Sequence, residues 1–227
     1  MTSEAATPAE SLIRAYEQKA ARYYSNARTD FVRQLPADPT ASVLEVGCGT
    51  GATGALALAR RRAGRYVGIE LMEAAAREAR EVLTDVYVGD VEKMTLDFQP
   101  ASFDALLLSE VLEHLVEPDA TLRRLARFLR PGGTVLASSP NVSHWRVVRE
   151  LLNGRFDLAD QGVFDRTHLR WFTPRSFVRM FHEAGFVIES AGPVTPFSAR
   201  TRLVTHLTGH RFDHLFMTQI ALRGVKR

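Results

Sequence analysis

The sequence predicts an α/β fold in which a doubly wound, mostly parallel sheet has helices on both faces. Short apolar runs alternate with amphipathic stretches of about ten residues, which is typical of strands joined by crossover helices. The first run, residues 42–46, stops at a glycine-rich turn that opens the next helix. The last run, residues 217–222, alternates apolar and polar side chains and predicts a closing strand paired with the strand before it.

Each element ends at a residue that interrupts helices or strands. Residues 8–35 have helical apolar spacing and stop before Pro36, so they predict an N-terminal helical region. We expect strands at residues 42–46, 66–69, 86–88, 103–108, 134–138, 186–190 and 217–222. We expect helices at residues 52–62, 72–83, 118–129 and 174–183.

A single domain accounts for all 227 residues. We expect residues 1–38 to form a helical cap on this domain. The alternation of strands and helices stops at residues 141–173, so we expect an insertion there. This insertion contains no convincing strand and carries several aromatic side chains, namely His144, Trp145, His168 and Trp171.

Composition is that of an ordinary globular protein, with 45% hydrophobic and 24% charged residues. A single cysteine, Cys48, excludes an internal disulfide and a cysteine-based zinc site. No apolar run is long enough to span a bilayer, and the N-terminus lacks a signal peptide, so we expect a cytoplasmic protein without a membrane partner. The net charge is +3, and its arginines are dispersed, so we expect no nucleic-acid partner.

The turn after the first strand carries the glycine pattern of a nucleotide-binding loop. Gly49, Gly51 and Gly54 satisfy G-x-G-x-x-G, which is also the pattern of dinucleotide-binding proteins. Glu45 at the strand tip argues against a dinucleotide, because a poorly solvated carboxylate would repel a pyrophosphate. The same carboxylate suits a ligand that carries an ammonium and a sulfonium group.

Acidic residues follow the next two strands as well. Glu70 ends the second strand, 19 residues after Gly51, where a carboxylate can accept hydrogen bonds from both hydroxyls of a ribose. Asp90 follows the third strand and is placed for the amino group of an adenine. Since the carboxyl ends of parallel strands meet at one edge of a sheet, the three acids predict one binding crevice.

From about residue 42 onward, the chain resembles the class I S-adenosylmethionine-dependent methyltransferases of the bacterial small-molecule type. The motifs that carry the resemblance are, in order, V-L-E-V-G-C-G-T-G, G-I-E, G-D-V, F-D-A-L-L-L-S-E-V-L-E-H-L and L-R-P-G-G. The resemblance implies a Rossmann-like sheet of seven strands with one antiparallel strand, and S-adenosylmethionine as cofactor. Where amino-group DNA methylases carry an N-P-P-Y-type motif, this chain reads S-E-V-L, so it departs from that group.

The resemblance also implies which residues bind the cofactor. Five lie in the glycine loop around the methionine moiety: Glu45, Gly47, Cys48, Gly49 and Gly51. Others contact the ribose, the adenine or the region below the cofactor: Glu70, Leu71, Asp90, Val91 and Ser109. Tyr24 on the cap is expected either to act as a lid over the cofactor or to take part in ordinary helix packing, and the insertion is expected to cover the acceptor site.

Three residues are candidates for catalysis: His168, His114 and Glu110. Glu110, Glu113 and His114 have i, i+3, i+4 spacing, which predicts one helical face beside the cofactor. We favour His168 as a metal-free general base, because imidazole titrates near neutral pH. The alternative for His168 is a structural role, in which its hydrogen bonds only hold the insertion in place.

The E-x-x-E-H pattern with a distant histidine is similar to a metal site of small-RNA 2′-O-methyltransferases and to the corresponding stretch of ubiquinone-pathway O-methyltransferases. This second interpretation makes Glu110, Glu113, His114 and His168 metal ligands. Two imidazoles suit manganese, iron or zinc better than magnesium. A bound divalent metal would lower the pKa of an acceptor hydroxyl.

The leading hypothesis is therefore a transferase that moves a methyl group to a hydroxyl, or else an amine, of a small molecule. Sugars, polysaccharide precursors and secondary metabolites are the expected acceptors, and a monomer or homodimer is the expected assembly. One alternative is methylation of RNA or protein with a metal-assisted E-x-x-E-H site. Another is a cofactor-binding protein without catalytic activity.

Overall fold

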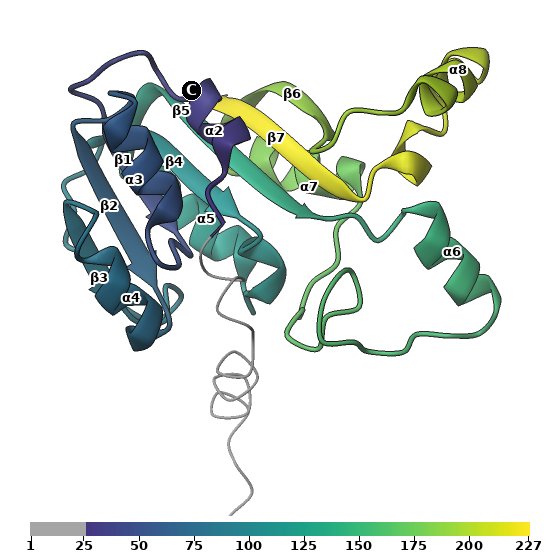
Figure 1. The fold of residues 1–227 in the computed structure, drawn as a ribbon, viewed down its shortest axis with the longest axis horizontal. Coiled ribbons are helices and arrows are strands. Elements are labelled where there is room, and N and C mark those ends of the chain that lie inside the picture. The colour runs from purple at the N-terminus through teal and green to yellow at the C-terminus, as the bar shows by residue number, and fades with distance from the viewer. Residues whose placement is uncertain (1–25) are drawn as a thin grey trace, which may run out of the picture.

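The computed structural model describes residues 26–227, and its seven strands pair in the order β3-β2-β1-β4-β5-β7-β6 (Figure 1). The strands are β1 Ser42–Val46, β2 Arg65–Glu70, β3 Asp85–Val88, β4 Phe103–Ser109, β5 Leu129–Pro140, β6 Phe186–Pro193 and β7 Gln219–Lys226. β1 to β5 are parallel, whereas β7 is antiparallel to both β5 and β6. The expected α/β class and the single reversed strand are confirmed.

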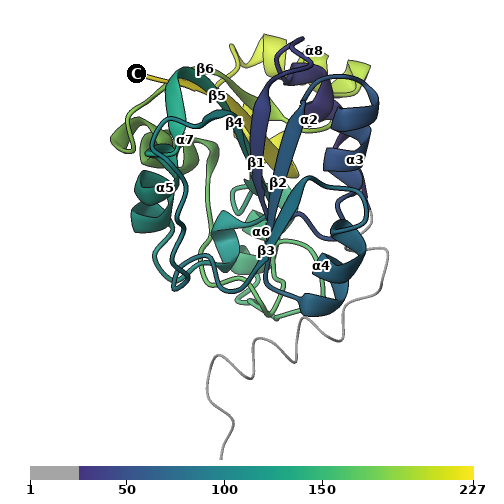
Figure 2. The ribbon, with the colours of Figure 1, turned by 90° about the vertical axis from the view of Figure 1, so that its left-hand side faces the viewer.

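Helices cover both faces of the sheet, as the sequence predicts (Figure 2). The α-helices are α2 Thr29–Gln34, α3 Ala52–Ala59, α4 Glu73–Ala79, α5 Pro118–Ala126, α6 Trp145–Leu152, α7 Pro174–Glu183 and α8 Ala199–Leu207. Two 3₁₀ turns are η2 Leu112–His114 and η3 Asp213–Phe216. Within residues 26–227, no helix combines the length and apolar character needed to cross a bilayer.

Two apolar layers lie on opposite faces of the sheet. The first contains Leu122 of α5 and Phe177 and Phe181 of α7, all fully buried. The second contains Phe31 of α2 and Tyr66 of β2, together with small residues of α3 and α4. Central strands therefore bury both faces, which explains why β1 and β4 are mostly apolar and do not alternate apolar with polar side chains.

The connections fix where a ligand can bind. β1 lies between β2 and β4, so the order of the strands reverses direction at β1. In open α/β sheets, the crevice outside the carboxyl ends of the strands at this switch point is where ligands bind. The carboxyl ends of β1, β2, β3 and β4 therefore bring Glu45, Glu70, Asp90 and Ser109 to one edge.

Several element boundaries differ from the expectation. The sequence predicts a strand at residues 134–138, but β5 is longer and includes the preceding P-G-G segment as an irregular, exposed stretch. Gly132 has φ of +74°, which a residue with a side chain rarely adopts and which this bulge requires. The helices predicted at residues 52–62, 72–83 and 118–129 are also shorter than expected. α3 ends at Ala59, α4 at Ala79 and α5 at Ala126.

The structure describes the whole insertion but only part of the cap. Residues 141–173 contain α6 and two isolated bridges, Asn141 to Phe172 and Ala159 to Asp165. No named strand occurs in this segment, all of which the structure describes. α2 belongs to the expected cap. The remainder of that cap, including Tyr24, lies outside the described residues.

Candidate active site

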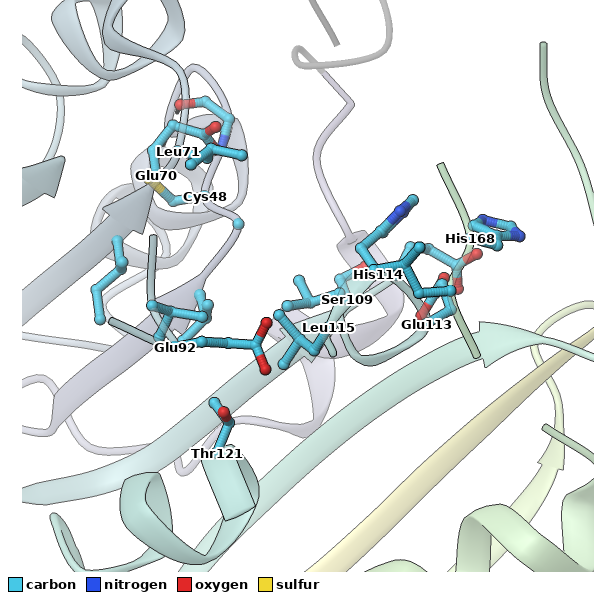
Figure 3. A pocket seen from close by; sticks show the side chains of 18 of the residues that line it. Cys48, Glu70, Leu71, Glu92, Ser109, Glu113, His114, Leu115, Thr121 and His168 are labelled. Atoms are coloured by element: carbon cyan, nitrogen blue, oxygen red, sulfur yellow. Dashed lines mark hydrogen bonds between the residues drawn. The ribbon is translucent and has the colours of Figure 1, made fainter. Parts of the chain in front are cut away.

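A cavity of about 1590 Å³ opens at the carboxyl edge of the sheet. This exceeds the roughly 300–1,000 Å³ of most small-molecule sites, so two ligands can fit side by side. Glu70 and Leu71 lie at one end of the cavity, and Glu113, His114 and His168 lie at the other (Figure 3). The two ends therefore differ in chemistry.

Most of the residues expected to bind the cofactor line this cavity: Glu45, Gly47, Cys48, Gly49, Glu70, Leu71, Asp90, Val91 and Ser109. Gly51 is not among the lining residues. It precedes α3 with φ of +80°, and a Cβ at this position would lie 2.9 Å from a methyl carbon of Val82. Gly51 therefore contributes to the shape of the turn. A side chain at this position would strain the backbone and clash with Val82.

Glu45 is a buried carboxylate at the end of β1, with only 2% of its surface exposed. The hydroxyl of Tyr66 donates a hydrogen bond to Glu45 Oε2 at 2.9 Å, and the Thr53 hydroxyl donates another. Burial nevertheless raises the pKa of Glu45 from 4.5 to about 7, because desolvation outweighs these two donors. A cation bound beside Glu45 would restore the charged form.

Glu70 supports the glycine loop as well as facing the cavity. Its Oε2 accepts a hydrogen bond from the Gly49 amide at 2.9 Å, and its Oε1 accepts one from the Met72 amide at 2.9 Å. Each carboxylate oxygen can accept a further hydrogen bond, so both remain available to a pair of ribose hydroxyls. Burial raises the pKa of Glu70 despite the two amides.

The third acid occupies a more exposed position. Asp90 Oδ1 accepts the Glu92 amide at 2.9 Å, and its Oδ2 pairs with Lys93 Nζ at 2.8 Å. Glu92 in turn accepts the amides of Val116 and Glu117, which joins this loop to the one before α5. The Asp90 loop is therefore tied by hydrogen bonds to the loop that precedes α5.

Arg28, which the sequence patterns did not single out, reaches into the cavity from the segment before α2. Its Nη1 donates to the hydroxyls of Ser109 and Ser138, the latter at 2.7 Å, and Asp30 binds the other side of the guanidinium. Arg28 thus ties the N-terminal segment to the ends of β4 and β5. No motif or periodicity in the chain marks this arginine, because its role depends on contacts distant in sequence.

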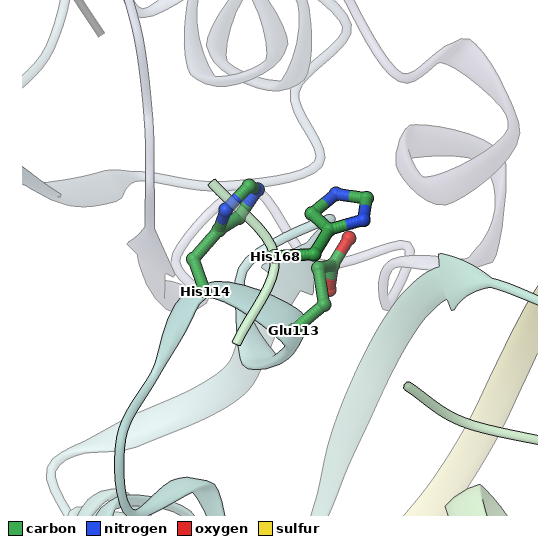
Figure 4. A group of neighbouring side chains, drawn as sticks. All are labelled: Glu113, His114 and His168. Carbon is green, nitrogen blue, oxygen red and sulfur yellow. The ribbon is translucent and has the colours of Figure 1, made fainter. Parts of the chain in front are cut away.

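At the opposite end of the cavity, Glu113, His114 and His168 form a compact cluster (Figure 4). One potential ligand atom from each residue lies within 4.8 Å of the others. His114 Nδ1 lies 3.0 Å from the Thr167 carbonyl, and His168 Nδ1 lies 3.1 Å from the Val163 carbonyl. A carbonyl only accepts, so the Nδ1 atom of each ring carries a proton and donates it to the carbonyl.

The cluster joins two segments that lie far apart in sequence. The Glu113 carbonyl accepts the amides of Leu169 and Arg170 at 2.8 and 3.0 Å, which docks the insertion onto η2. The Ser139 hydroxyl at the end of β5 donates to Glu113 Oε2 at 3.1 Å. The insertion therefore meets the sheet edge at the histidines.

Glu110 does not join this cluster, and the predicted helical face is wrong. Only residues 112–114 form a 3₁₀ turn, and Glu110 precedes it with φ of +54°. Gln219 of β7 donates to Glu110 Oε2 at 3.0 Å, and burial raises the pKa of this carboxyl. Glu110 lines the same cavity from a different side, so it is not a fourth ligand of the cluster.

A doubly wound sheet with acids at the ends of β1 and β2 defines a protein that binds a nucleoside-containing ligand at its switch point. A family model described as a methyltransferase domain matches residues 16–191. The chain therefore belongs to the methyltransferase domain family, and S-adenosylmethionine is the cofactor that this family implies.

Known proteins agree with this assignment. Ubiquinone biosynthesis O-methyltransferase of Xanthomonas campestris is 38% identical over 131 residues, covering 55% of this chain and 53% of that protein. The protein of the same name from Neisseria meningitidis is 29% identical over 164 residues, covering 67% of this chain and 66% of its own. The chain thus spans about half the length of the first of these relatives.

Solved structures extend the similarity of fold to nearly the whole chain. A SAM-dependent methyltransferase from Archaeoglobus fulgidus superimposes with a TM-score of 0.64 and 16% identity. The superposition covers 95% of this chain and 98% of that protein. The sheet and its helices are therefore those of a Rossmann-like methyltransferase.

Proposed function

We propose that this chain transfers a methyl group from S-adenosylmethionine to a hydroxyl of a small molecule in the cytoplasm. The single observation that carries the proposal is the pair of imidazoles, His114 and His168, at the far end of the cavity from the acids. A hydroxyl acceptor must lose a proton when it is methylated, and an imidazole is suited to take it. The relatives named O-methyltransferases support oxygen as the acceptor atom.

The residues present fit the cofactor. A cation beside Glu45 would meet a buried carboxylate, and a ribose would meet the two oxygens of Glu70. Val91 and Leu115 supply apolar surface next to Asp90. When bound, S-adenosylmethionine supplies an electrophilic methyl carbon on a sulfonium, which leaves as a neutral thioether.

His168 has the role of general base in this proposal. The Val163 carbonyl fixes its Nδ1–H, so Nε2 receives the hydroxyl proton while the acceptor oxygen bonds to the methyl carbon. The carbon–sulfur bond breaks in the same displacement, and positioning supplies most of the rate. His114 is held in the same tautomer by Thr167 and orients the acceptor from the other side.

A divalent metal at Glu113, His114 and His168 is a second way to activate the hydroxyl. Two imidazole nitrogens and one carboxylate are a donor set that manganese, iron and zinc accept. Backbone carbonyls that fix the Nδ1–H of each ligating histidine are typical partners in such sites. These three residues would hold the metal, and its charge would lower the pKa of the acceptor hydroxyl.

Methyl transfer from labelled S-adenosylmethionine to a panel of catechols, sugar nucleotides, amines and RNA tests the proposal. We expect label in hydroxyl acceptors, a loss of about 100-fold or more in His168→Gln, and normal cofactor binding in that variant. His206→Gln, on the exposed α8, is the matched control and should retain full activity.

The same assay separates the alternatives. Activity that survives chelator treatment but not His168→Gln favours the metal-free base, whereas activity restored by added manganese or zinc favours the metal. Label found in RNA with a steep salt dependence would favour the nucleic-acid alternative. Binding of S-adenosylmethionine without transfer to any acceptor class would favour a protein that only binds the cofactor.

A further inference from the structure

Helix α8 carries apolar side chains that the core does not use. Of its nine residues, only Thr205 is buried. Leu203 is 60% exposed and Leu207 is 74% exposed, with Val204 exposed beside them. These three residues lie on one side of the helix and Thr205 lies on the other, since positions i and i+4 share a face. The apolar side of α8 therefore points away from the protein.

The same segment is strongly basic. Residues 199–212 contain Arg200, Arg202 and Arg211 and no acidic residue. All three arginines are exposed, and Phe212 is 43% exposed at the end of the segment. We call the side chains of Arg200, Arg202, Leu203, Val204, Leu207, Arg211 and Phe212 the α8 surface.

A second helix of the same character lies at the same end of the molecule. α6 and α8 both lie at the end of the molecule opposite β3 and α4 (Figure 1). On α6, Leu152 is 83% exposed and Leu151 is 46% exposed. The guanidiniums of Arg146 and Arg149 each lie 5.4 Å from the centre of the Trp145 ring. This end therefore exposes aliphatic, aromatic and cationic groups together.

We propose that the α8 surface binds peripherally to a lipid bilayer that carries anionic headgroups. An interfacial helix buries an apolar face at the boundary between headgroups and acyl chains while its basic residues contact anionic lipids. Long arginine side chains can reach the headgroups while their carbon stems stay among apolar groups. With nine residues, α8 is too short to span a bilayer, so it lies in the plane of the surface.

Charge and apolarity together favour a bilayer over other occupants. A second copy of the α8 surface would bring like-charged arginines together, which disfavours self-association. RNA would pair with the arginines but would leave Leu203 and Leu207 unburied, because nucleic-acid contact rests on phosphates and bases. A bilayer satisfies both groups. The proposed binding is to the membrane surface and needs no membrane-spanning helix. It replaces the expectation that the protein has no membrane partner.

Sedimentation with vesicles tests the proposal on the full chain. Vesicles of phosphatidylcholine with about 30% phosphatidylglycerol should bind the protein, and pure phosphatidylcholine should bind it far less. Arg200→Gln with Arg202→Gln should lower the partition coefficient by roughly 30-fold, since each arginine near an anionic surface contributes about fivefold. Leu203→Ser with Leu207→Ser should lower it at least about tenfold.

The matched control is Arg60→Gln with Arg61→Gln, which removes the same charge at the end of α3, on the other side of the molecule. This control should bind vesicles like the unaltered protein, and near-identical circular dichroism should verify that each variant is folded. Equal binding of the control and the α8 variants would overturn the proposal. So would equal binding to both vesicle types, tighter binding to poly(U) RNA than to the vesicles, or concentration-dependent dimers that the leucine variants abolish.

Discussion

Replacing Glu45 with glutamine should stabilise the ligand-free protein near pH 8 and weaken its binding of S-adenosylmethionine. Glu45 is 2% exposed, and burial raises its pKa from 4.5 to about 7. Above pH 7 the folded protein therefore contains a charge at this buried site, and the attraction of Arg28 only partly offsets the desolvation of Glu45. Glutamine keeps the shape and an acceptor for the Tyr66 hydroxyl, but it carries no charge.

The magnitude follows from the two pKa values. The difference between 4.5 and about 7 corresponds to about 3 kcal/mol, which the charged form costs the folded protein at high pH. A raised pKa contributes stability that is complete below pH 4.5 and is lost as the pH rises through 7. Glu45→Gln removes this loss, so its advantage should grow from near zero at pH 4.5 to about 1–3 kcal/mol at pH 8.

Urea unfolding at pH 5 and pH 8, followed by tryptophan fluorescence, measures the stability. Calorimetry with S-adenosylhomocysteine and S-adenosylmethionine measures the binding, which should weaken about 10- to 100-fold when the carboxylate is lost. Glu81→Gln, an exposed glutamate beyond α4, is the control and should change neither quantity. A Glu45→Gln protein that is less stable at pH 8, or that binds the cofactor normally, would refute the reasoning.

Three further outcomes are expected. In the unaltered protein, S-adenosylmethionine should bind about tenfold more tightly at pH 8 than at pH 6, because the pKa of Glu45 is about 7 and binding uses the charged form; calorimetry that finds no pH dependence would contradict this. Gly54→Ala should lower stability by about 1–3 kcal/mol in thermal unfolding, because the added Cβ would lie 2.3 Å from a Leu83 carbon. Gly192→Ala is the control and should leave stability unchanged, because the space around Gly192 is open. Glu70→Gln should cost about 1–3 kcal/mol in stability, because one of the two amide donors loses its acceptor, and should also weaken cofactor binding by calorimetry.

The sheet, and the end of the cavity that contains Glu45 and Glu70, could be predicted largely from local sequence. β1, β2 and β4 are apolar runs that end at turns, and burial on both faces is what such runs require. Glu45 and Glu70 could be placed together because strand ends share an edge whatever the details of packing. These features depend on a few neighbouring residues and on general rules of chain connection.

Other features depend on tertiary contacts that no local pattern encodes. The E-V-L-E-H stretch has helical spacing, yet Glu110 adopts φ of +54° and faces Gln219 of β7. Arg28 lies in an ordinary polar stretch, and only the approach of Ser109 and Ser138 gives it a role. The separation of Glu110 from the histidine cluster could therefore not be deduced from spacing alone.

The position of β7 has a consequence for how the protein is made. β7 follows every other strand in the chain, yet it lies between β5 and β6 in the sheet. During synthesis, β5 and β6 emerge first. Until residues 219–226 arrive, β5 has one unpaired edge and β6 has no partner strand. Pairing of β5 with β7 also closes a long loop that contains both the insertion and α8, which is a slow step. A chain that ends before residue 219 therefore leaves the edge of β5 exposed and β6 without its partner strand.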